Sequence, residues 1–319
     1  MSHWVVTGGV GFIGYHLCRA MAARGDEIVI VDDFSDAPYP RAEKLRNQRD
    51  LLEEHGARVR VVTACVTDRE ALRPHFAGAA GVVHLAGLAG VRPSFKDPAR
   101  YSRVNVEGTA VTLGLAREAG VRRYLFASSS SVYGNSTPLP AREDAPAIVP
   151  ESPYAATKRG AELVASAMAR IMGDLPITAL RFFTVYGPRQ RPEMAITLFM
   201  RSVLRGEPIT VFGDGSMRRD FTHVDDIVRG ILGAMDKAPP GFRAYNLGSG
   251  SPIRLDALVD AISSAARKPA QIVRAEVPPG DVDATFADVT RAREELGYAP
   301  RMPLEEGIAT VRAWVEANV

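Results

Sequence analysis

Short apolar runs alternate with longer amphipathic segments through the first 180 residues of the chain. The apolar runs are rich in Val, Ile, Leu and aromatic residues and predict buried strands at 5–7, 28–31, 59–62, 82–85, 124–127 and 177–180. Between them, segments of helical length and period predict helices at 12–24, 41–55, 68–76, 100–119 and 153–172. Strands that alternate with helices form βαβ units with right-handed crossovers. The pattern therefore predicts an α/β fold of the Rossmann type, a doubly wound parallel sheet with helices on both faces.

The pattern changes after Gly187, where Pro, Gly and Arg become frequent and the apolar runs shorten. Helices are predicted there at 194–204, 254–267 and 305–317, separated by irregular segments. We interpret residues 1–180 as one domain and 181–319 as a smaller α/β domain, with the chain returning to the first domain near 223–247. The two domains are expected to interleave rather than to be joined by a clean linker.

Charge and cysteine content narrow the class of protein. The 319 residues include 39 Lys and Arg against 37 Asp and Glu, a net charge of +2, which excludes a dominant nucleic-acid surface. The two cysteines, Cys18 and Cys65, cannot form a disulfide framework, and no Cys/His spacing resembles a metal site. The chain starts directly with an apolar strand and has no apolar run of membrane-spanning length. We expect a cytoplasmic protein without metal, membrane or nucleic-acid partners.

Three glycines stand between the first predicted strand and the first predicted helix. Gly8, Gly11 and Gly14 recur every three residues, which lets the backbone turn sharply and approach a pyrophosphate at the helix N-terminus. Asp32 ends the second strand, 18 residues beyond Gly14, where a carboxylate accepts both hydroxyls of an adenosine ribose and repels a 2′-phosphate. This position favours NAD over NADP, and Asp33 is the alternative acid. A tight turn followed by a capping acid is the competing interpretation, which the order of the parts disfavours.

Tyr154 and Lys158 lie four residues apart and therefore on one face of a predicted helix. The lysine charge, together with an oxidised nicotinamide, should lower the pKa of the phenol from its ordinary value of about 10, so that Tyr154 acts as a general base. Lys158 is one of five lysines beside 34 arginines, which makes its occurrence at this spacing informative. Four serines at 128–131 follow the fifth strand, at the sheet edge where such folds bind ligands. A hydroxyl there can bridge a substrate oxygen and Tyr154.

These features together resemble the extended short-chain dehydrogenases/reductases, and most closely their nucleotide-sugar epimerase group. The resemblance covers nearly the whole chain and includes the segments 132–134 (VYG), 181–188 (RFFTVYGP), 219–226 (RDFTHVDD) and 279–282 (PGDV). It implies a bound NAD that takes a hydride from a sugar and later returns it. It also implies that Tyr154 takes the hydroxyl proton, that Lys158 holds the nicotinamide ribose, and that Ser129 is the catalytic serine. The cofactor-binding residues expected are Gly8, Gly11, Phe12, Ile13, Gly14, Asp32, Val66, Leu85, Ala86, Gly87, Asn105, Tyr154 and Lys158.

Within this family, the residues beside the reacting hydroxyl distinguish the reactions. Sugar 4,6-dehydratases carry an Asp-Glu pair where this chain has Ser130 and Ser131, and uronate decarboxylases carry a Glu at the second position. Without those acids, oxidation, rotation of the keto intermediate and reduction from the other face remain, and this sequence of steps inverts carbon 4. The segments 90–94 (GVRPS) and 191–195 (RPEMA) resemble UDP-glucuronate 4-epimerases more than galactose epimerases, which usually have Asn where Thr184 stands.

The resemblance therefore implies a UDP-sugar substrate, most closely UDP-glucuronate. Thr184, the neighbouring serines and Arg191 would hold its carboxylate through charge-assisted hydrogen bonds. A 4-keto uronate is a β-keto acid, and a carboxylate held in the plane of the ring should lose carbon dioxide more slowly.

The phosphates and the uracil are expected in the second domain, because seven arginines stand against four acids in the segment 181–223. Arg219 is the candidate for the diphosphate, Asp281 for the uridine ribose and Phe212 for the base. The substrate-binding residues expected are Arg92, Ser129, Ser130, Ser131, Thr184, Arg191, Phe212, Arg219 and Asp281.

Two positions depart from the family pattern. Many relatives carry Gly-Asp at 64–65, with the aspartate on the adenine amine, whereas this chain has Cys65 and would use backbone groups near Val66. Many relatives also have an arginine on the phosphates at Pro278, a role for which Arg274 is the candidate here.

Several other assignments stay open. They are a 4-epimerase of UDP-glucose or UDP-N-acetylglucosamine, a UDP-glucuronate decarboxylase, an NADP-dependent carbonyl reductase, which Asp32 disfavours, and a non-catalytic NAD-sensing regulator. The complete set of Ser129, Tyr154 and Lys158 disfavours the regulator. Because the helices at 100–119 and 153–172 commonly pair across a dimer in this family, we also expect a homodimer.

Overall fold

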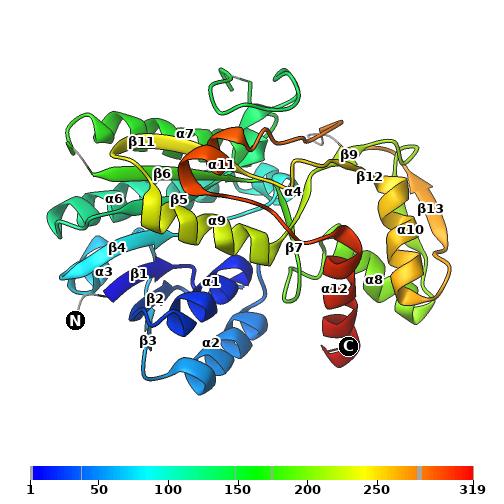
Figure 1. Cartoon of the computed structure of the whole chain (residues 1–319), viewed down its shortest axis with the longest axis horizontal. Helices are drawn as coiled ribbons and strands as arrows, with labels where there is room; N and C mark the ends of the chain where they lie inside the picture. The colour runs from blue at the N-terminus through cyan, green and yellow to red at the C-terminus, as the bar shows by residue number, and fades with distance from the viewer. Residues whose placement is uncertain (1–2, 37, 148, 174, 279–281, 319) are drawn as a thin grey trace.

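A computed structural model describes residues 3–36, 38–147, 149–173, 175–278 and 282–318. Its largest element is a sheet of seven parallel strands in the order β11-β6-β5-β4-β1-β2-β3 (Figure 1). These strands are β1 (His3–Thr7), β2 (Ile28–Asp32), β3 (Val59–Thr63), β4 (Ala79–His84), β5 (Tyr124–Ser129), β6 (Pro176–Phe182) and β11 (Gly241–Leu247). The order reverses between β1 and β4, and in open α/β sheets ligands bind beyond the carboxyl ends of strands at such a reversal. The predicted fold class is confirmed.

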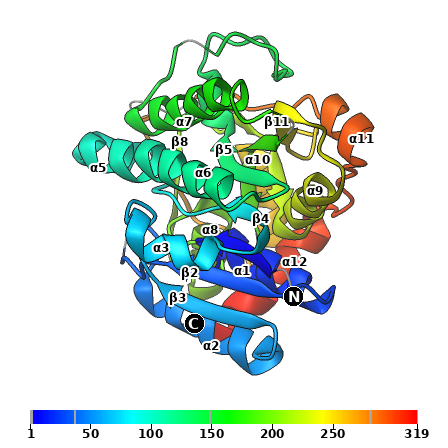
Figure 2. The same cartoon turned by 90° about the vertical axis from the view of Figure 1, so that its left-hand side faces the viewer.

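Helices cover both faces of the sheet (Figure 2). On one face, α1 (Phe12–Ala23) packs against α2 (Arg41–His55) and α9 (Val224–Lys237). On the other face, α6 (Gly108–Glu118) packs against α3 (Arg69–Phe76) and α7 (Pro153–Ala169).

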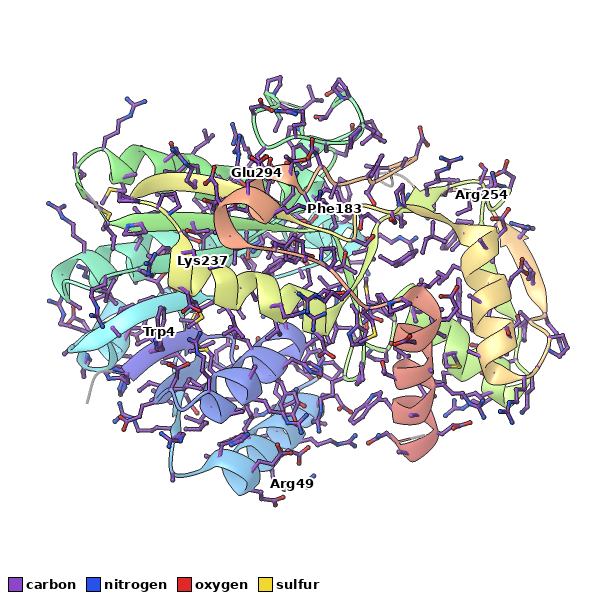
Figure 3. The ribbon with its side chains drawn as sticks, in the orientation of Figure 1. Trp4, Arg49, Phe183, Lys237, Arg254 and Glu294 are labelled. Carbon is purple, nitrogen blue, oxygen red and sulfur yellow. The ribbon has the colours of Figure 1, made fainter. Side chains whose placement is uncertain are left out.

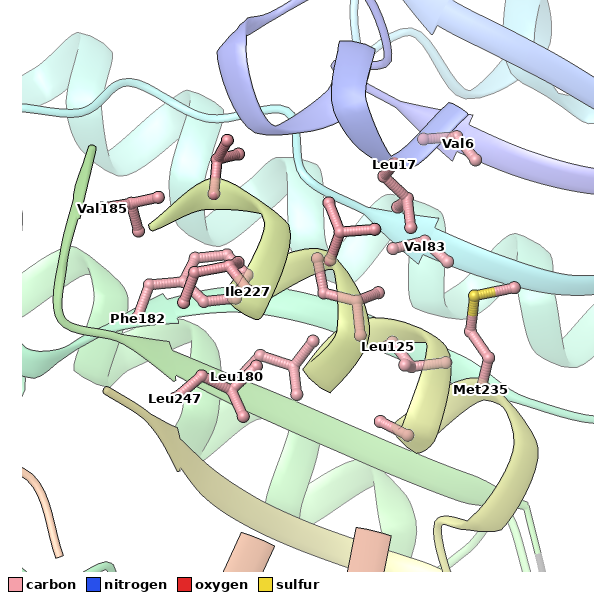
Figure 4. Close-up of a cluster of buried hydrophobic side chains, with 14 of the residues drawn as sticks. Val6, Leu17, Val83, Leu125, Leu180, Phe182, Val185, Ile227, Met235 and Leu247 are labelled. Carbon is pink, nitrogen blue, oxygen red and sulfur yellow. The ribbon is translucent and has the colours of Figure 1, made fainter. Parts of the chain in front are cut away.

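Alternate strand residues face these two helical layers, as the period of a strand requires. Val6, Val83 and Leu125 pack toward α1 and α9, in the cluster that Figure 4 shows. Their neighbours Val5 and Val82 pack toward α3, α6 and α7. The inner strands β1, β4 and β5 are therefore buried on both sides, which explains why they appear in the sequence as short continuous apolar runs.

Two elements of the sheet layers come from the second half of the chain and were not predicted as elements. The helix α9 buries apolar residues at helical spacing, and the strand β11 pairs with β6 along its whole length. The sequence of β11 (GFRAYNL) mixes polar and apolar residues and gives no clear strand pattern. The predicted helix at 100–119 is instead three pieces, α5 (Pro98–Ser102), a π-helical turn (Arg103–Glu107) and α6.

A second lobe lies beside the sheet and contains α8 (Ala195–Arg205), α10 (Leu255–Ala266) and α12 (Leu304–Asn318) (Figure 1). These helices agree with the predicted ones to within one residue at each end. They share a buried cluster with the strand β8 (Ile209–Phe212), which pairs with β13 (Ile272–Ala275). Trp4 in the sheet and Arg254 beside α10 mark opposite ends of the molecule (Figure 3).

Two short strand pairs lie near the junction of the lobes. The strand β7 (Thr184–Tyr186) pairs with β10 (Phe221–His223), and β9 (Arg218–Arg219) pairs with β12 (Ile253–Arg254). Three of these strands are parts of the two motifs that the sequence singled out around Thr184 and Arg219. No helix in the described ranges is long and apolar enough to cross a membrane.

Candidate active site

A cavity of about 1140 Å³ lies between the carboxyl edge of the sheet and the second lobe. The predicted cofactor residues in its lining are Gly8, Gly11, Phe12, Ile13, Gly14, Asp32, Val66, Leu85, Ala86, Gly87, Tyr154 and Lys158. The predicted substrate residues in its lining are Arg92, Ser129, Ser130, Ser131, Thr184, Arg191, Phe212 and Arg219. Residues far apart in the sequence are thus brought to one site. Asp281 lies outside the described residues, and none of those described belongs to a group of His, Cys, Asp and Glu placed to hold a metal ion.

The glycine loop is closed so tightly that side chains would not fit. Gly8 has a φ of +71°, and a Cβ there would lie 2.6 Å from the Ala86 nitrogen. A Cβ at Gly14 would lie 2.1 Å from the Gly8 oxygen. The helix α1 begins directly after Gly11, so that its free N–H groups lie at the cavity wall. This geometry fits the pyrophosphate of a dinucleotide.

Asp32 has a partner that sequence reasoning missed. Its Oδ1 accepts hydrogen bonds from the Phe34 nitrogen at 2.9 Å and from Lys44 Nζ at 2.9 Å. Lys44 lies on α2, lines the same cavity and is itself buried. Burial raises the pKa of Asp32, and the charge and hydrogen bond of Lys44 oppose that rise. The rarity of lysine in the chain was the one available signal for Lys44.

The four serines have different environments, because β5 extends to Ser129 and successive strand residues point to opposite sides. Ser128 donates to Glu162 Oε1 at 2.6 Å, inside the protein. Ser129 Oγ lies 3.1 Å from Ser131 Oγ and also accepts from the Ser131 nitrogen at 3.2 Å. Ser130 and Ser131 begin a short 3₁₀ turn. The hydroxyls of Ser129 and Ser131 are therefore adjacent in the cavity wall, which Ser130 also lines.

Tyr154 and Lys158 are held by the start of α7. Ser152 caps this helix by accepting from the Ala155 nitrogen at 3.2 Å, with Pro153 in the first turn. Lys158 is buried and donates from Nζ to the Ala127 carbonyl at 2.8 Å. Burial lowers the pKa of Lys158 to about 8, against the opposing charge of Glu162.

The pKa of Tyr154 differs from the sequence prediction. Burial raises this pKa, and the two groups that lower it are Ser129, through a hydrogen bond, and Arg191, through its charge. Lys158 was expected to supply that charge, but its Nζ is directed to the Ala127 carbonyl. In the protein alone, the tyrosine is therefore tuned by a serine and by a residue predicted to bind substrate.

Asn105 supports the cavity from behind and is not in its lining. Its Nδ2 donates to the Leu88 carbonyl at 3.0 Å, and its Oδ1 accepts from the Leu88 nitrogen at 2.8 Å. A Cβ at Gly87 would lie 3.0 Å from Asn105 Oδ1 and 3.2 Å from Lys158 Nζ. Asn105 thus fixes the segment after β4 beside the lysine.

On the substrate side, Arg92 and Phe212 meet across the cavity. The Arg92 guanidinium lies 4.8 Å from the centre of the Phe212 ring, so that the sheet lobe and the second lobe touch there. Arg191 is mostly buried and pairs with Glu193 at 3.2 Å. Arg219 donates to the Arg218 and Asp283 carbonyls at 3.0 and 3.3 Å.

The two departures from the family pattern have different environments. Cys65 lines the cavity, with its Sγ 3.2 Å from Thr67 Oγ1. Arg274, the candidate to compensate for Pro278, donates to the Gly213 carbonyl at 3.4 Å and is not in the cavity lining. Compensation by Arg274 therefore has no support in this arrangement.

The glycine loop, the acid after β2 and the Ser/Tyr/Lys group together define a dinucleotide-dependent enzyme. The sequence model of the NAD dependent epimerase/dehydratase family matches residues 4–248. The chain belongs to this family, and its cofactor is NAD.

Full-length relatives support this assignment. A UDP-glucuronate 4-epimerase of Thermodesulfobacterium geofontis is 35% identical over 100% of this chain and 98% of its own. UDP-glucuronate 4-epimerase 5 of Arabidopsis thaliana is 39% identical over 97% of this chain and 74% of its own. The crystal structure of UDP-glucuronic acid 4-epimerase from Bacillus cereus with UDP-glucuronic acid and NAD superimposes with a TM-score of 0.90, at 31% identity and 99% coverage of both chains.

Replacing Lys44 with Met is expected to weaken NAD binding about tenfold near pH 7, the effect of losing a charged hydrogen bond. Because Lys44 lowers the pKa of Asp32, its loss raises that pKa further, and the buried carboxylate takes up a proton more readily. Ionisation returns as the pH rises, so the NAD affinity of the variant should increase with pH more steeply than that of the wild type.

Fluorescence titration of NAD-free protein at three pH values measures this effect. Arg49→Met is the matched control, since Arg49 lies on the same helix and its side chain is 63% exposed (Figure 3). Equal NAD affinities for Lys44→Met and the wild type would show that Lys44 does not act on the ribose site.

Proposed function

We propose that this protein is an NAD-dependent 4-epimerase that interconverts UDP-glucuronate and UDP-galacturonate. The observation on which this proposal depends is the position of Arg191. This cation lies in the cavity wall with Thr184 and the hydroxyls of residues 129–131, and its charge acts on Tyr154. A cation near the reacting hydroxyl suits a sugar that carries a carboxylate on carbon 5, the ring carbon next to carbon 4. The named relatives act on such a sugar.

The roles of the residues follow from their contacts. NAD, held by the glycine loop, Asp32 and Lys158, would supply hydride acceptance from carbon 4 and hydride donation to the opposite face of the keto intermediate. Tyr154 takes the proton of the 4-hydroxyl and gives it back, with Ser129 hydrogen-bonded to it. Lys158 is held by the Ala127 carbonyl beside Gly87, in the position proposed for the nicotinamide ribose. The glycine loop and Asp32 orient the other end of the cofactor.

The acids in the cavity favour epimerisation over elimination of water. Ser130 and Ser131 occupy the positions where dehydratases carry acids. The two glutamates that line the cavity have other partners: Glu151 accepts from the Asn135 nitrogen at 3.2 Å, and Glu193 pairs with Arg191. Both glutamates therefore already have a partner in the cavity wall.

Arg191 and Thr184 would also protect the product of the first step. A carboxylate held by a cation and a hydroxyl in the plane of the ring stays out of alignment with a carbonyl at carbon 4, which slows loss of carbon dioxide. This role explains how an enzyme can oxidise a uronate without decarboxylating it.

The domain division and assembly are part of the proposal. We propose an NAD-binding domain at 1–180, to which the chain returns at 223–247, and a substrate-binding domain in the remainder of 181–319. A homodimer would pair through α6 and α7, and Leu163 on α7 is 55% exposed. Both cysteines are free, which suits a cytoplasmic setting.

Replacing Arg191 with Ala is expected to lower kcat/KM for UDP-glucuronate by about 10- to 100-fold, the range for losing a charged hydrogen bond. UDP-glucose has no carboxylate, so its kcat/KM should change far less. The ratio of the two values, from assays in which the products are separated, is the measurement. Arg205→Ala, at the exposed end of α8, is the matched control.

Three outcomes would contradict the proposal. Equal losses on both sugars would exclude carboxylate recognition by Arg191. A wild-type enzyme that turned UDP-glucuronate mainly into a UDP-pentose and carbon dioxide would be a decarboxylase. A lasting requirement for added NADPH would indicate a reductase.

A further inference from the structure

Arg189, two residues before Arg191, extends away from the cavity and joins three helices. Its NH1 donates to Asn47 Oδ1 at 2.5 Å, and its NH2 donates to Asp50 Oδ2 at 2.6 Å. Its guanidinium lies 4.0 Å from the ring centre of Tyr15 and 4.8 Å from that of Trp314. We name this group, Arg189 with Tyr15, Asn47, Asp50 and Trp314, the Arg189 clamp. It connects α1, α2 and α12 to the loop that contains Arg191.

The backbone of this loop is fixed in the same way. The Arg189 carbonyl accepts from the Tyr39 hydroxyl at 2.9 Å, and the Pro188 carbonyl accepts from His16 Nε2 at 2.9 Å. Gln190 donates from its side chain to the Val185 carbonyl at 2.7 Å. Three consecutive residues are therefore held by separate contacts, and the next residue in the chain is Arg191.

The backbone of Arg189 has a conformation that requires support from the surrounding contacts. Its φ is +66°, in the left-handed region that a residue with a Cβ rarely adopts. Such a conformation persists where the surrounding contacts hold it, and such residues gather at functional sites. Here the hydrogen bonds of the Arg189 guanidinium group and its stacking on the rings of Tyr15 and Trp314 supply those contacts.

The clamp also reaches the cofactor site. Asn47, which accepts from Arg189, donates from Nδ2 to the Val10 carbonyl in the glycine loop at 2.9 Å. A single side chain thus connects the segment after β1 with the segment that contains Arg191. The distance between the cofactor loop and the substrate cation is set through Arg189 and Asn47.

We propose that Arg189 is a positioning residue for sugar recognition: by fixing the loop, it places the Arg191 guanidinium where the substrate carboxylate binds. This inference rests on the proposed function. A misplacement of about 1 Å by a change outside the reacting centre can cost about 100-fold in rate. Lysine cannot replace the fork and the ring stacking of arginine, although it keeps the charge beside Asp50.

The experiment compares Arg189→Met and Arg189→Lys with the wild type at saturating NAD. We expect the ratio of kcat/KM for UDP-glucuronate over UDP-glucose to fall about tenfold or more in Arg189→Met, mainly through KM for UDP-glucuronate, and less in Arg189→Lys. Arg19→Met is the matched control, because Arg19 pairs with Glu54 at 2.9 Å between the same helices α1 and α2, outside the loop. It should leave the ratio unchanged.

A double variant separates positioning from general damage. If Arg189 acts through Arg191, adding Arg189→Met to Arg191→Ala leaves the ratio where Arg191→Ala alone puts it, since coupled residues are not additive. A further fall in that background, or equal losses on both sugars, would overturn the inference.

Failure of this inference is distinguishable from failure of the proposed function. A normal ratio in both Arg189 variants, with the ratio lowered in Arg191→Ala, overturns the positioning role alone. A normal ratio in Arg191→Ala overturns both. If Arg189→Met does not fold, Arg189→Lys and its double variant with Arg191→Ala give the same readouts.

Discussion

Replacement of Tyr154 with Phe is expected to lower kcat on UDP-glucuronate by about 10²- to 10⁴-fold, the usual contribution of a general base. The phenylalanine keeps the ring, which packs edge-on against Tyr101 at 6.3 Å between ring centres, so the fold should not change. NAD binding should persist, because the glycine loop and Lys158 are intact. Turnover assays together with NAD titration measure the two effects separately.

Tyr101→Phe is the matched control for this change. Tyr101 loses the same hydroxyl, which donates to the Ala89 carbonyl at 2.9 Å and lies outside the cavity lining. Its kcat should stay within about threefold of the wild type, as expected for a neutral hydrogen bond. Activity retained in Tyr154→Phe would place the base elsewhere, and loss of NAD binding would mean that the tyrosine acts mainly on the cofactor.

The sequence predicted the parts of the fold that depend on local pattern. Most of the first six strands of the sheet are buried and appear as continuous apolar runs, whereas the edge strand β3 exposes Arg60 and was located from the valines around it. The seventh strand, β11, could not be found locally, because its Arg243 and Asn246 interrupt the run and its place in the sheet depends on pairing with β6. The sequence also predicted that Tyr154, Lys158 and Arg191 belong to one site, because each stands in a local motif that can be recognised from residue types and their spacing.

Contacts between different helices and strands could not be predicted from the sequence. The pairing of Lys44 with Asp32 depends on how α2 lies against the end of β2. The stacking of Arg92 on Phe212 and the path of Arg189 depend on how the two lobes meet. The run at 128–131 illustrates the limit within one motif. All four serines line the cavity, but the hydroxyl of Ser128 is bonded to the buried Glu162, whereas that of Ser129 is bonded to Ser131.

Glu162, which accepts a hydrogen bond from Ser128 in the interior, also pairs with Arg181, and loss of this ion pair should have the largest effect on stability. Arg181 and Glu162 are both buried, and Arg181 donates to the two Glu162 oxygens at 2.9 and 2.8 Å. Replacing Arg181 with Met leaves that carboxylate buried without its main partner. We expect this to lower the free energy of unfolding by about 3–5 kcal/mol, the usual cost of breaking a buried pair. Urea denaturation of both proteins near pH 7 measures the difference.

The pH dependence distinguishes loss of this ion pair from loss of packing. Burial alone would raise the pKa of Glu162, but the hydrogen bonds and charge of Arg181 outweigh it and lower that pKa. The pair therefore stabilises the fold above the unfolded pKa of glutamate, about 4.3, and its contribution fades as the pH falls toward the lowered folded value. Without Arg181 the buried Glu162 takes up a proton at higher pH, so the penalty of Arg181→Met should shrink between about pH 7 and about pH 5.

Arg159→Met, which removes a partly exposed partner of the same carboxylate, should cost less than about 1 kcal/mol, as for an exposed pair. A penalty independent of pH would mean that Arg181 stabilises the fold by packing, because only the charged pair depends on the ionisation of Glu162.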